Sequence, residues 1–382
     1  MRIKTAAVIG GGIAGPVAAL ALRKAGIEAT VYEAHDRPAD GVGGTIALAP
    51  NGVAALGIVG VELPASQPAD RQVMAVGGKR IELPGVAGAG PMHVVRRGDL
   101  HRVLRDAFPD VVSGRRLVSA VSHDDSVIAD FSDGSMIKAD VLVGADGVHS
   151  VVRGLIDPSA PGPRFTGMLA FEGRSRFEVP ERPGTMTFAF GKRGYYLYWP
   201  APGGGTTFGV NLPWPRPLTI AEARATPAAD WLRTLLEIYG DDTPGGDLLR
   251  HIDPADLQVN GALHIMPPVP HWSRGRMVLT GDAVHAPSNS SGQGASLAIE
   301  SAVELARCLR DISPIHEAFR KYEDLRRGRV ERIAAQAARI NSTKTPGRLG
   351  QALLPLIIRL ALNPEKTSGP ALRYRIDWDS TL

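Results

Sequence analysis

This chain of 382 residues has little cysteine, few aromatic side chains and no long apolar run. Its single cysteine, Cys308, excludes an internal disulfide framework and fits a reducing compartment, and the ten histidines show no metal-ligand spacing. No segment approaches the roughly 18 apolar residues of a membrane span, and no charged-then-apolar leader opens the chain. We therefore expect a cytoplasmic protein with no metal site and no stable membrane insertion.

The chain also lacks a strong excess of charge of one sign. It has 43 basic and 39 acidic side chains, and this surplus of +4 is too small and too dispersed to indicate nucleic-acid binding. The densest basic stretch, 320–332, is interleaved with Glu323, Asp324 and Glu331, which is typical of a solvated helix face. The length favours two closely joined domains.

What the chain does have is a glycine turn between a strand and a helix. Residues 6–19 read AAVIGGGIAGPVAA, in which Gly10, Gly12 and Gly15 suit a tight turn, close approach to a pyrophosphate and close helix–strand packing. Glu33 follows at the tip of the next strand, near the distance expected for a carboxylate that binds a ribose. The pattern predicts a dinucleotide site at a helix N-terminus.

Two further segments repeat the passage from a buried strand into a glycine turn. Residues 141–153, VLVGADGVHSVVR, contain the pair Asp146-Gly147, and residues 277–295, MVLTGDAVHAPSNSSGQGA, contain Asp282. With these three ordered motifs, the chain resembles the single-component flavin monooxygenases of the para-hydroxybenzoate hydroxylase family over nearly its full length. The resemblance implies that FAD is the dinucleotide.

The resemblance also implies roles for single residues. The first motif holds the FAD pyrophosphate, and Glu33 binds the adenosine ribose. Arg97, or its neighbour Arg96, reaches the phosphate–ribityl region; Asp146 supports FAD near the path of the nicotinamide donor; Asp282 hydrogen-bonds the ribityl chain. The expected FAD contacts are Gly10, Gly12, Ala14, Gly15, Glu33, Gly44, Arg97, Leu117, Asp146, Asp282, Gly292, Gln293 and Gly294.

The third motif can stabilise the charge of reduced flavin through its backbone N–H groups. Reduced flavin carries negative charge near N1, and the N–H groups of Gly292, Gln293 and Gly294 at a helix start can stabilise that charge. Three departures from the family pattern stand nearby or in the neighbouring sheet. Asn289 replaces a usual proline, so we expect a differently shaped loop beside the flavin ring. Ser301 stands in place of a common aspartate, and Glu172 in place of a frequent arginine.

The predicted fold is α/β: a Rossmann-like FAD-binding domain, an antiparallel-sheet substrate domain and a C-terminal helical segment. Residues 115–143 predict a three-stranded meander that ends in the buried run 141–143, and the apolar segment 349–362 predicts a helix packed on the body. The expected boundaries are 1–72, 96–163 and 268–340 for the FAD-binding domain, 73–95 and 164–267 for the substrate domain, and 341–382 for the C-terminal segment.

The implied reaction begins when NADPH or NADH reduces FAD. Dioxygen then forms a flavin hydroperoxide, which hydroxylates an aromatic or polyketide-like small molecule. Two alternatives are a flavin oxidoreductase that inserts no oxygen and a non-catalytic flavoprotein that binds a hydrophobic metabolite. The choice of NADH or NADPH, the hydroxylated, epoxidised or ring-expanded outcome, and the monomeric or homodimeric state stay open. The triplet 43–45 adds a resemblance to the tetracycline-inactivating members.

No catalytic residue is assigned from the sequence. His285 is a candidate base, although a structural role in its turn is favoured, and Glu172, Arg174 and His264 are polar enough to orient a ligand. The expected substrate contacts come from the predicted sheet and a following turn: Phe188, Tyr196, Tyr198, Asn211, Met266 and Pro267.

Overall fold

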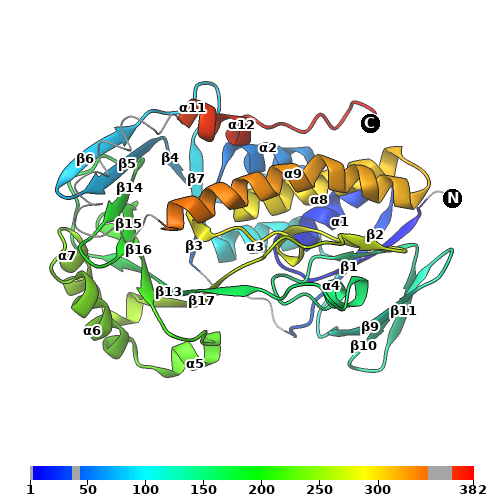
Figure 1. Cartoon of the computed structure of the whole chain (residues 1–382), viewed down its shortest axis with the longest axis horizontal. Helices are drawn as coiled ribbons and strands as arrows, with labels where there is room; N and C mark the ends of the chain where they lie inside the picture. Colours follow the sequence, from blue (N-terminus) through cyan, green and yellow to red (C-terminus); the bar gives the residue numbers. More distant parts are fainter. Residues whose placement is uncertain (1–2, 37–43, 343–363) are drawn as a thin grey trace.

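The computed structural model describes residues 3–36, 44–342 and 364–382 (Figure 1). The predicted helix at 349–362 and Gly43 of the triplet 43–45 lie outside these residues. Within them, no helix is long and apolar enough to cross a membrane.

One half of the molecule is built on a six-stranded sheet in the order β18-β19-β12-β1-β2-β8. Neighbouring strands are parallel except for β18 and β19, as expected for strands joined by crossover helices. The strands are β1 Thr5–Ile9, β2 Glu28–Tyr32, β8 Val111–Val112, β12 Val141–Gly144, β18 Ser273–Arg274 and β19 Met277–Leu279.

Helices pack against this sheet and carry much of the core. Buried side chains fill α1 and almost the whole of α8, and the single cysteine, Cys308, is fully buried in α8. Its thiol pKa is raised to about 12 by burial. The helices of this half are α1 Ala14–Lys24, α2 Pro50–Ile58, α3 Arg97–Ala107, α4 Val151–Ile156, α8 Gly294–Asp311 and α9 Ile315–Ser342.

The predicted meander is a separate three-stranded sheet of β9 (Leu117–Ser122), β10 (Val127–Phe131) and β11 (Met136–Ala139). The buried run 141–143 is not its last strand: it is β12, which pairs with β1 in the six-stranded sheet. The expectation was wrong here because a run apolar on both faces belongs in a sheet covered on both sides.

The other half is built on a seven-stranded, mostly antiparallel sheet, which lies away from β1 in Figure 1. Strands β5 and β6 form an antiparallel hairpin at one edge of this sheet, while β7 joins β3 and β4 in a small sheet between the two halves. Strand bounds are β3 Thr45–Leu48, β4 Gln67–Ala69, β5 Arg71–Val76, β6 Lys79–Leu83, β7 Met92–Arg96, β13 Arg164–Ser175, β14 Thr185–Phe190, β15 Tyr195–Pro200, β16 Thr206–Pro213 and β17 Gln258–Ile265.

The seven-stranded sheet has two unlike faces. Helices α5 (Ile220–Ala225), α6 (Ala228–Tyr239) and α7 (Gly245–Arg250) cover one face, which we call the outer face, around Phe171 and Trp231. The opposite, inner face carries Glu172, which bonds to Thr45 of β3. The inner face is therefore turned toward the six-stranded sheet.

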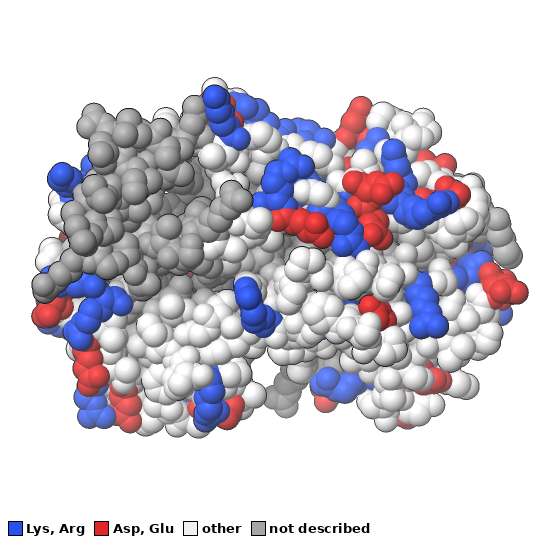
Figure 2. Space-filling model, in the orientation of Figure 1, with Lys and Arg blue, Asp and Glu red and all other residues white. Residues whose placement is uncertain are grey.

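The basic stretch 320–332 lies on α9. Figure 2 shows basic and acidic side chains side by side along this helix, and Arg327 pairs with both Glu323 and Glu331. This confirms the predicted solvated face, with two exceptions. Arg326 is fully buried and Arg329 is mostly buried, and they pair with Glu300 at 2.7 and 2.8 Å.

Candidate functional site

The glycines of the first turn have three different surroundings. Gly10 has φ +108°, and a Cβ there would lie 2.4 Å from the carbonyl oxygen of Ala145 in the second motif. A Cβ on Gly15 would lie 1.8 Å from the carbonyl oxygen of Gly10. At Gly12, no heavy atom of the described residues, apart from its two chain neighbours, lies within 4 Å of a built Cβ. Gly10 and Gly15 are thus required by packing, whereas Gly12 leaves room beside the turn for a ligand.

Side chains hold this turn from two directions. Glu33 accepts hydrogen bonds from the N–H groups of Gly11 at 2.7 Å and His35 at 2.9 Å, so it shapes the turn as well as carrying the predicted ribose contact. His101 of α3 places Nε2 2.7 Å from the carbonyl oxygen of Gly11. Sequence reasoning missed His101, although it lies one helical turn after Arg97 on the same short helix.

The third motif packs directly on the first. Gly281 has φ +61°, and a Cβ there would lie 2.8 Å from Cβ of Ala14. Burial raises the pKa of the neighbouring Asp282 carboxyl, and the positive charge of Arg97 partly opposes that rise. The N–H of Arg97 donates to the carbonyl oxygen of Gly44 at 3.0 Å. The structure therefore gathers Ala14, Gly44, Arg97 and Asp282 into one region.

The second motif supplies a helix cap. Asp146 accepts hydrogen bonds from the Ser150 hydroxyl at 2.5 Å and from the N–H groups of Val151 and Val152 at 2.7 and 3.1 Å, which satisfies the start of α4. Burial raises the pKa of its carboxyl despite these bonds. Asp146 thus orders the turn that receives Gly10.

The loop before α8 is tied to α2. Asn51 is 1 % exposed and donates from Nδ2 to Oε1 of Gln293 at 3.0 Å and to Oε1 of Glu300 at 2.6 Å. Two of the three amides expected at the flavin have partners within the loop: Gly292 donates to the carbonyl oxygen of Asn289, and Gln293 donates to the Ser291 hydroxyl. Their predicted contact with reduced flavin requires these bonds to be exchanged.

A buried ionic cluster lies behind that loop. Glu300 is fully buried between Arg326 and Arg329, and these charges outweigh the desolvation that would raise its carboxyl pKa, so that the pKa is lowered. Ser301, found in place of the family aspartate, lies 2.8 Å from Nε2 of His285 and accepts from Arg326. Burial lowers the pKa of His285 to about 3, which suits the structural role expected of it.

The inner sheet face brings polar and aromatic groups toward this region. Glu172 accepts from the N–H and the hydroxyl of Thr45, and burial raises its carboxyl pKa against these bonds. Asn211 stands opposite Ala170, two residues along the same face, and Phe188 stands opposite Leu197 on that face. Phe188 packs with Met92, whose Cε is close to Gly292.

Tyr196 and Tyr198 lie apart from the other expected substrate contacts. Both lie on the outer face and belong to the core between sheet and helices, where Tyr196 packs edge-on against Tyr239. The Tyr196 hydroxyl accepts from the N–H of Gly245, and the Tyr198 hydroxyl donates to Glu181. Strand alternation thus places these two tyrosines on the face opposite Glu172 and Asn211, so the structure does not bring them together with the other expected substrate contacts.

Three remaining candidates have clear positions. Met266 is buried, and its N–H donates to the carbonyl oxygen of Ala286, so the turn with Pro267 adjoins the third motif. Leu117 begins β9 with its side chain in the core. His264 faces His149 of the second motif, with ring centroids 5.4 Å apart.

Residues 3–188 and 264–337 match the model of the FAD binding domain family. The chain belongs to this family. It is 34 % identical to the 3-amino-4-hydroxybenzoate 2-monooxygenase PtmB3 of Streptomyces platensis, over 86 % of this chain and 85 % of that protein. It is 32 % identical to an FAD-dependent urate hydroxylase of Klebsiella pneumoniae subsp. pneumoniae, over 87 % and 88 %. The chain is thus an FAD-dependent monooxygenase, and the predicted α/β fold is confirmed.

Solved structures share the fold of this chain. The crystal structure of Klebsiella pneumoniae HpxO with FAD and uric acid has a TM-score of 0.82 at 27 % identity and covers 97 % of this chain and 96 % of that one. The tetracycline destructase Tet(55) shares the fold, with a TM-score of 0.71 at 22 % identity over 98 % and 99 %. The residues of the monooxygenase suit FAD, because the open side of Gly12 and the helix start after it can receive a pyrophosphate.

Proposed function

We propose that this monooxygenase hydroxylates a small polar aromatic compound, using NADPH or NADH as the electron donor and dioxygen as the oxygen source. The observation that carries the proposal is the meeting of three distant turns, through Gly10 with Ala145 and Ala14 with Gly281, beside the Arg97–Asp282 pair. When bound there, FAD supplies the redox chemistry and the activation of dioxygen.

The residues of the chain then have distinct tasks. Gly12 admits the pyrophosphate, Arg97 neutralises its charge, and Asp282 accepts hydrogen bonds from the ribityl hydroxyls. On the inner sheet face, Asn211 orients a polar ring substituent, and Phe188 packs on the ring and excludes water. Small ring substrates are favoured because the curated relatives include hydroxylases named for aminohydroxybenzoate, urate and 6-hydroxynicotinate.

The test uses the purified protein loaded with FAD. Oxidation of NADPH and NADH is followed while 3-amino-4-hydroxybenzoate, urate and 6-hydroxynicotinate are added in turn under labelled dioxygen. We expect one compound to stimulate oxidation and to yield a product that carries one labelled oxygen atom. Stimulated oxidation that yields only hydrogen peroxide with every aromatic compound would instead establish an oxidoreductase without oxygen insertion.

A further inference from the structure

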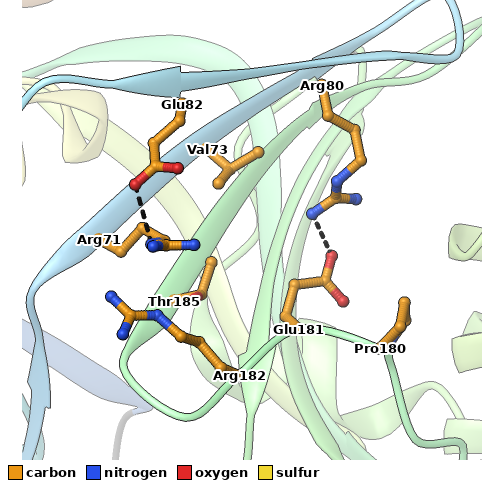
Figure 3. Close-up of a pocket in the computed structure, with 8 residues that line it drawn as sticks. All are labelled: Arg71, Val73, Arg80, Glu82, Pro180, Glu181, Arg182 and Thr185. Atoms are coloured by element: carbon orange, nitrogen blue, oxygen red, sulfur yellow. Dashed lines mark hydrogen bonds and ion pairs between the residues drawn. The ribbon is translucent and has the colours of Figure 1, made fainter.

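A pocket lies on the outer face of the seven-stranded sheet (Figure 3). It is beside β5 and β6, which lie at the end of the molecule distant from β1 in Figure 1. It has a volume of about 410 Å³ and is formed by β5, β6 and the segment that leads into β14. We call it the outer pocket; its polar lining residues are Arg71, Arg80, Glu82, Glu181, Arg182 and Thr185.

Strand register separates the outer pocket from the flavin region. Thr187 pairs with Tyr198 and with Val73, which places Val73 on the outer face with that tyrosine. Thr185 and Arg71 pair two residues earlier on the same face. The inner face, with Glu172 and Asn211, is on the other side of the sheet. The sheet thus separates a ligand in the outer pocket from the predicted substrate position.

One side of the outer pocket is cationic and has an unused hydroxyl. Thr185 is 3 % exposed, and its Oγ1 has no hydrogen-bond partner among the described residues. Arg71 pairs with Glu82 at 2.9 Å, but the carboxylate nearest to Arg182, that of Asp70, is 3.8 Å away. Figure 3 shows both guanidinium groups beside Thr185. Two neighbouring guanidinium groups and a hydroxyl favour a carboxylate between them.

The other side of the outer pocket carries the ion pair of Arg80 and Glu181 and also has an unused atom. The Glu181 side chain is 4 % exposed, and its Oε1 accepts from the Tyr198 hydroxyl at 2.8 Å and pairs with Arg80. Its Oε2 is buried without a hydrogen-bond partner among the described residues. Because a buried carboxylate oxygen without a donor is destabilising, this side favours a ligand group that donates a hydrogen bond. In Figure 3 the two sides face each other across the outer pocket.

We infer that the outer pocket binds a small molecule with a carboxylate at one end and an amino or hydroxyl donor at the other. The carboxylate lies between Arg71 and Arg182 and accepts from the Thr185 hydroxyl. The donor lies at Oε2 of Glu181. A simple anion is disfavoured, because it would leave the buried Oε2 of Glu181 without a hydrogen-bond donor.

The probe is 4-aminobutyrate, which has both ends and no aromatic ring. Two matched comparators each lack one end: butyrate has no amine, and butylamine has no carboxylate. Affinities are measured by ligand-observed NMR titration of the FAD-loaded protein. We expect 4-aminobutyrate to bind at least about tenfold more tightly than either comparator, because each end makes a charge-assisted hydrogen bond.

Variants locate the binding. Thr185→Val and Arg182→Gln are each expected to weaken 4-aminobutyrate about tenfold. Thr185→Val should leave the melting temperature unchanged, since the hydroxyl has no partner in the described structure. Arg176→Gln is the control, because Arg176 is exposed and pairs with Asp253 outside the outer pocket. Equal affinity for the three probes, or equal affinity in all variants, would overturn the inference.

Discussion

Gly12 and Gly15 belong to one motif, but Gly15 is tightly packed against the backbone whereas Gly12 has open space beside it. We expect Gly15→Ala to destabilise the protein by about 1–3 kcal/mol or more, because its Cβ would overlap the Gly10 carbonyl oxygen. Gly12→Ala should leave the apoprotein as stable as wild type and weaken FAD binding at least about tenfold. Denaturant unfolding of the apoproteins and FAD titration test this pair. A loss of apoprotein stability in Gly12→Ala would contradict the assignment of Gly12 to the ligand.

His285 makes stability depend on pH. An unfolded histidine titrates near pH 6.5, whereas burial lowers the folded pKa of His285 to about 3. The folded state therefore binds fewer protons, and the stability that neutral His285 contributes above pH about 6.5 is lost as the pH falls toward 3. His285→Gln should reduce this slope by up to about 1.4 kcal/mol per pH unit.

The measurement is the free energy of unfolding of the apoprotein between pH 7 and the lowest pH at which it folds, roughly pH 4. His316→Gln is the control, because His316 is exposed at the start of α9. Equal slopes in wild type and His285→Gln would show that another group controls the loss of stability in acid.

At the scale of elements, Asn51 connects α2 to the loop that opens α8. Asn51→Ala removes the donor shared by Gln293 and Glu300 in a buried site. We expect the free energy of unfolding to fall by about 1–3 kcal/mol, and the absorption spectrum of bound FAD to change because the loop beside it is released. If stability falls as expected but the flavin spectrum is unchanged, Asn51 stabilises the fold without positioning the loop beside the flavin.

The two faces of the seven-stranded sheet give a further prediction. Phe188→Ala and Asn211→Ala, on the inner face, are expected to raise KM for the aromatic substrate about tenfold. Tyr196→Phe, on the outer face, should leave KM unchanged. Steady-state kinetics compares the three variants with the aromatic compound that the hydroxylation assay selects. If KM rises only in Tyr196→Phe, the substrate binds on the outer face and not on the inner face.

The turns and strand faces of the site differ in how far they could be predicted from the sequence. The turns at Gly10, Asp146 and Asp282 were predicted because each follows a buried strand and precedes a helix, which is a local signal. The faces of β15 were not predictable: both faces of its sheet are covered, so apolar residues alternate with other apolar residues. The Asn51–Glu300 hydrogen bond joins residues 249 positions apart, so no local sequence pattern indicates it.

At the scale of the whole molecule, the flavin region joins segments from both ends of the chain. Gly10 meets Ala145, and Ala14 meets Gly281, so FAD bound there stabilises the contacts between distant segments. FAD at a hundredfold excess over its Kd should raise the free energy of unfolding by about 2.7 kcal/mol. Thermal unfolding with increasing FAD tests this, and Asp282→Ala should shift the response to higher FAD concentrations. A melting temperature that does not change with FAD concentration would contradict the assignment of this region as the FAD site.

Cys308 offers a practical consequence of the buried helix α8. Because the chain has no other thiol and this one is fully buried with its pKa raised to about 12, thiol reagents can modify the protein only when α8 becomes exposed. The rate of alkylation, read by mass spectrometry without any attached dye, thus reports how often the C-terminal part of α8 becomes exposed.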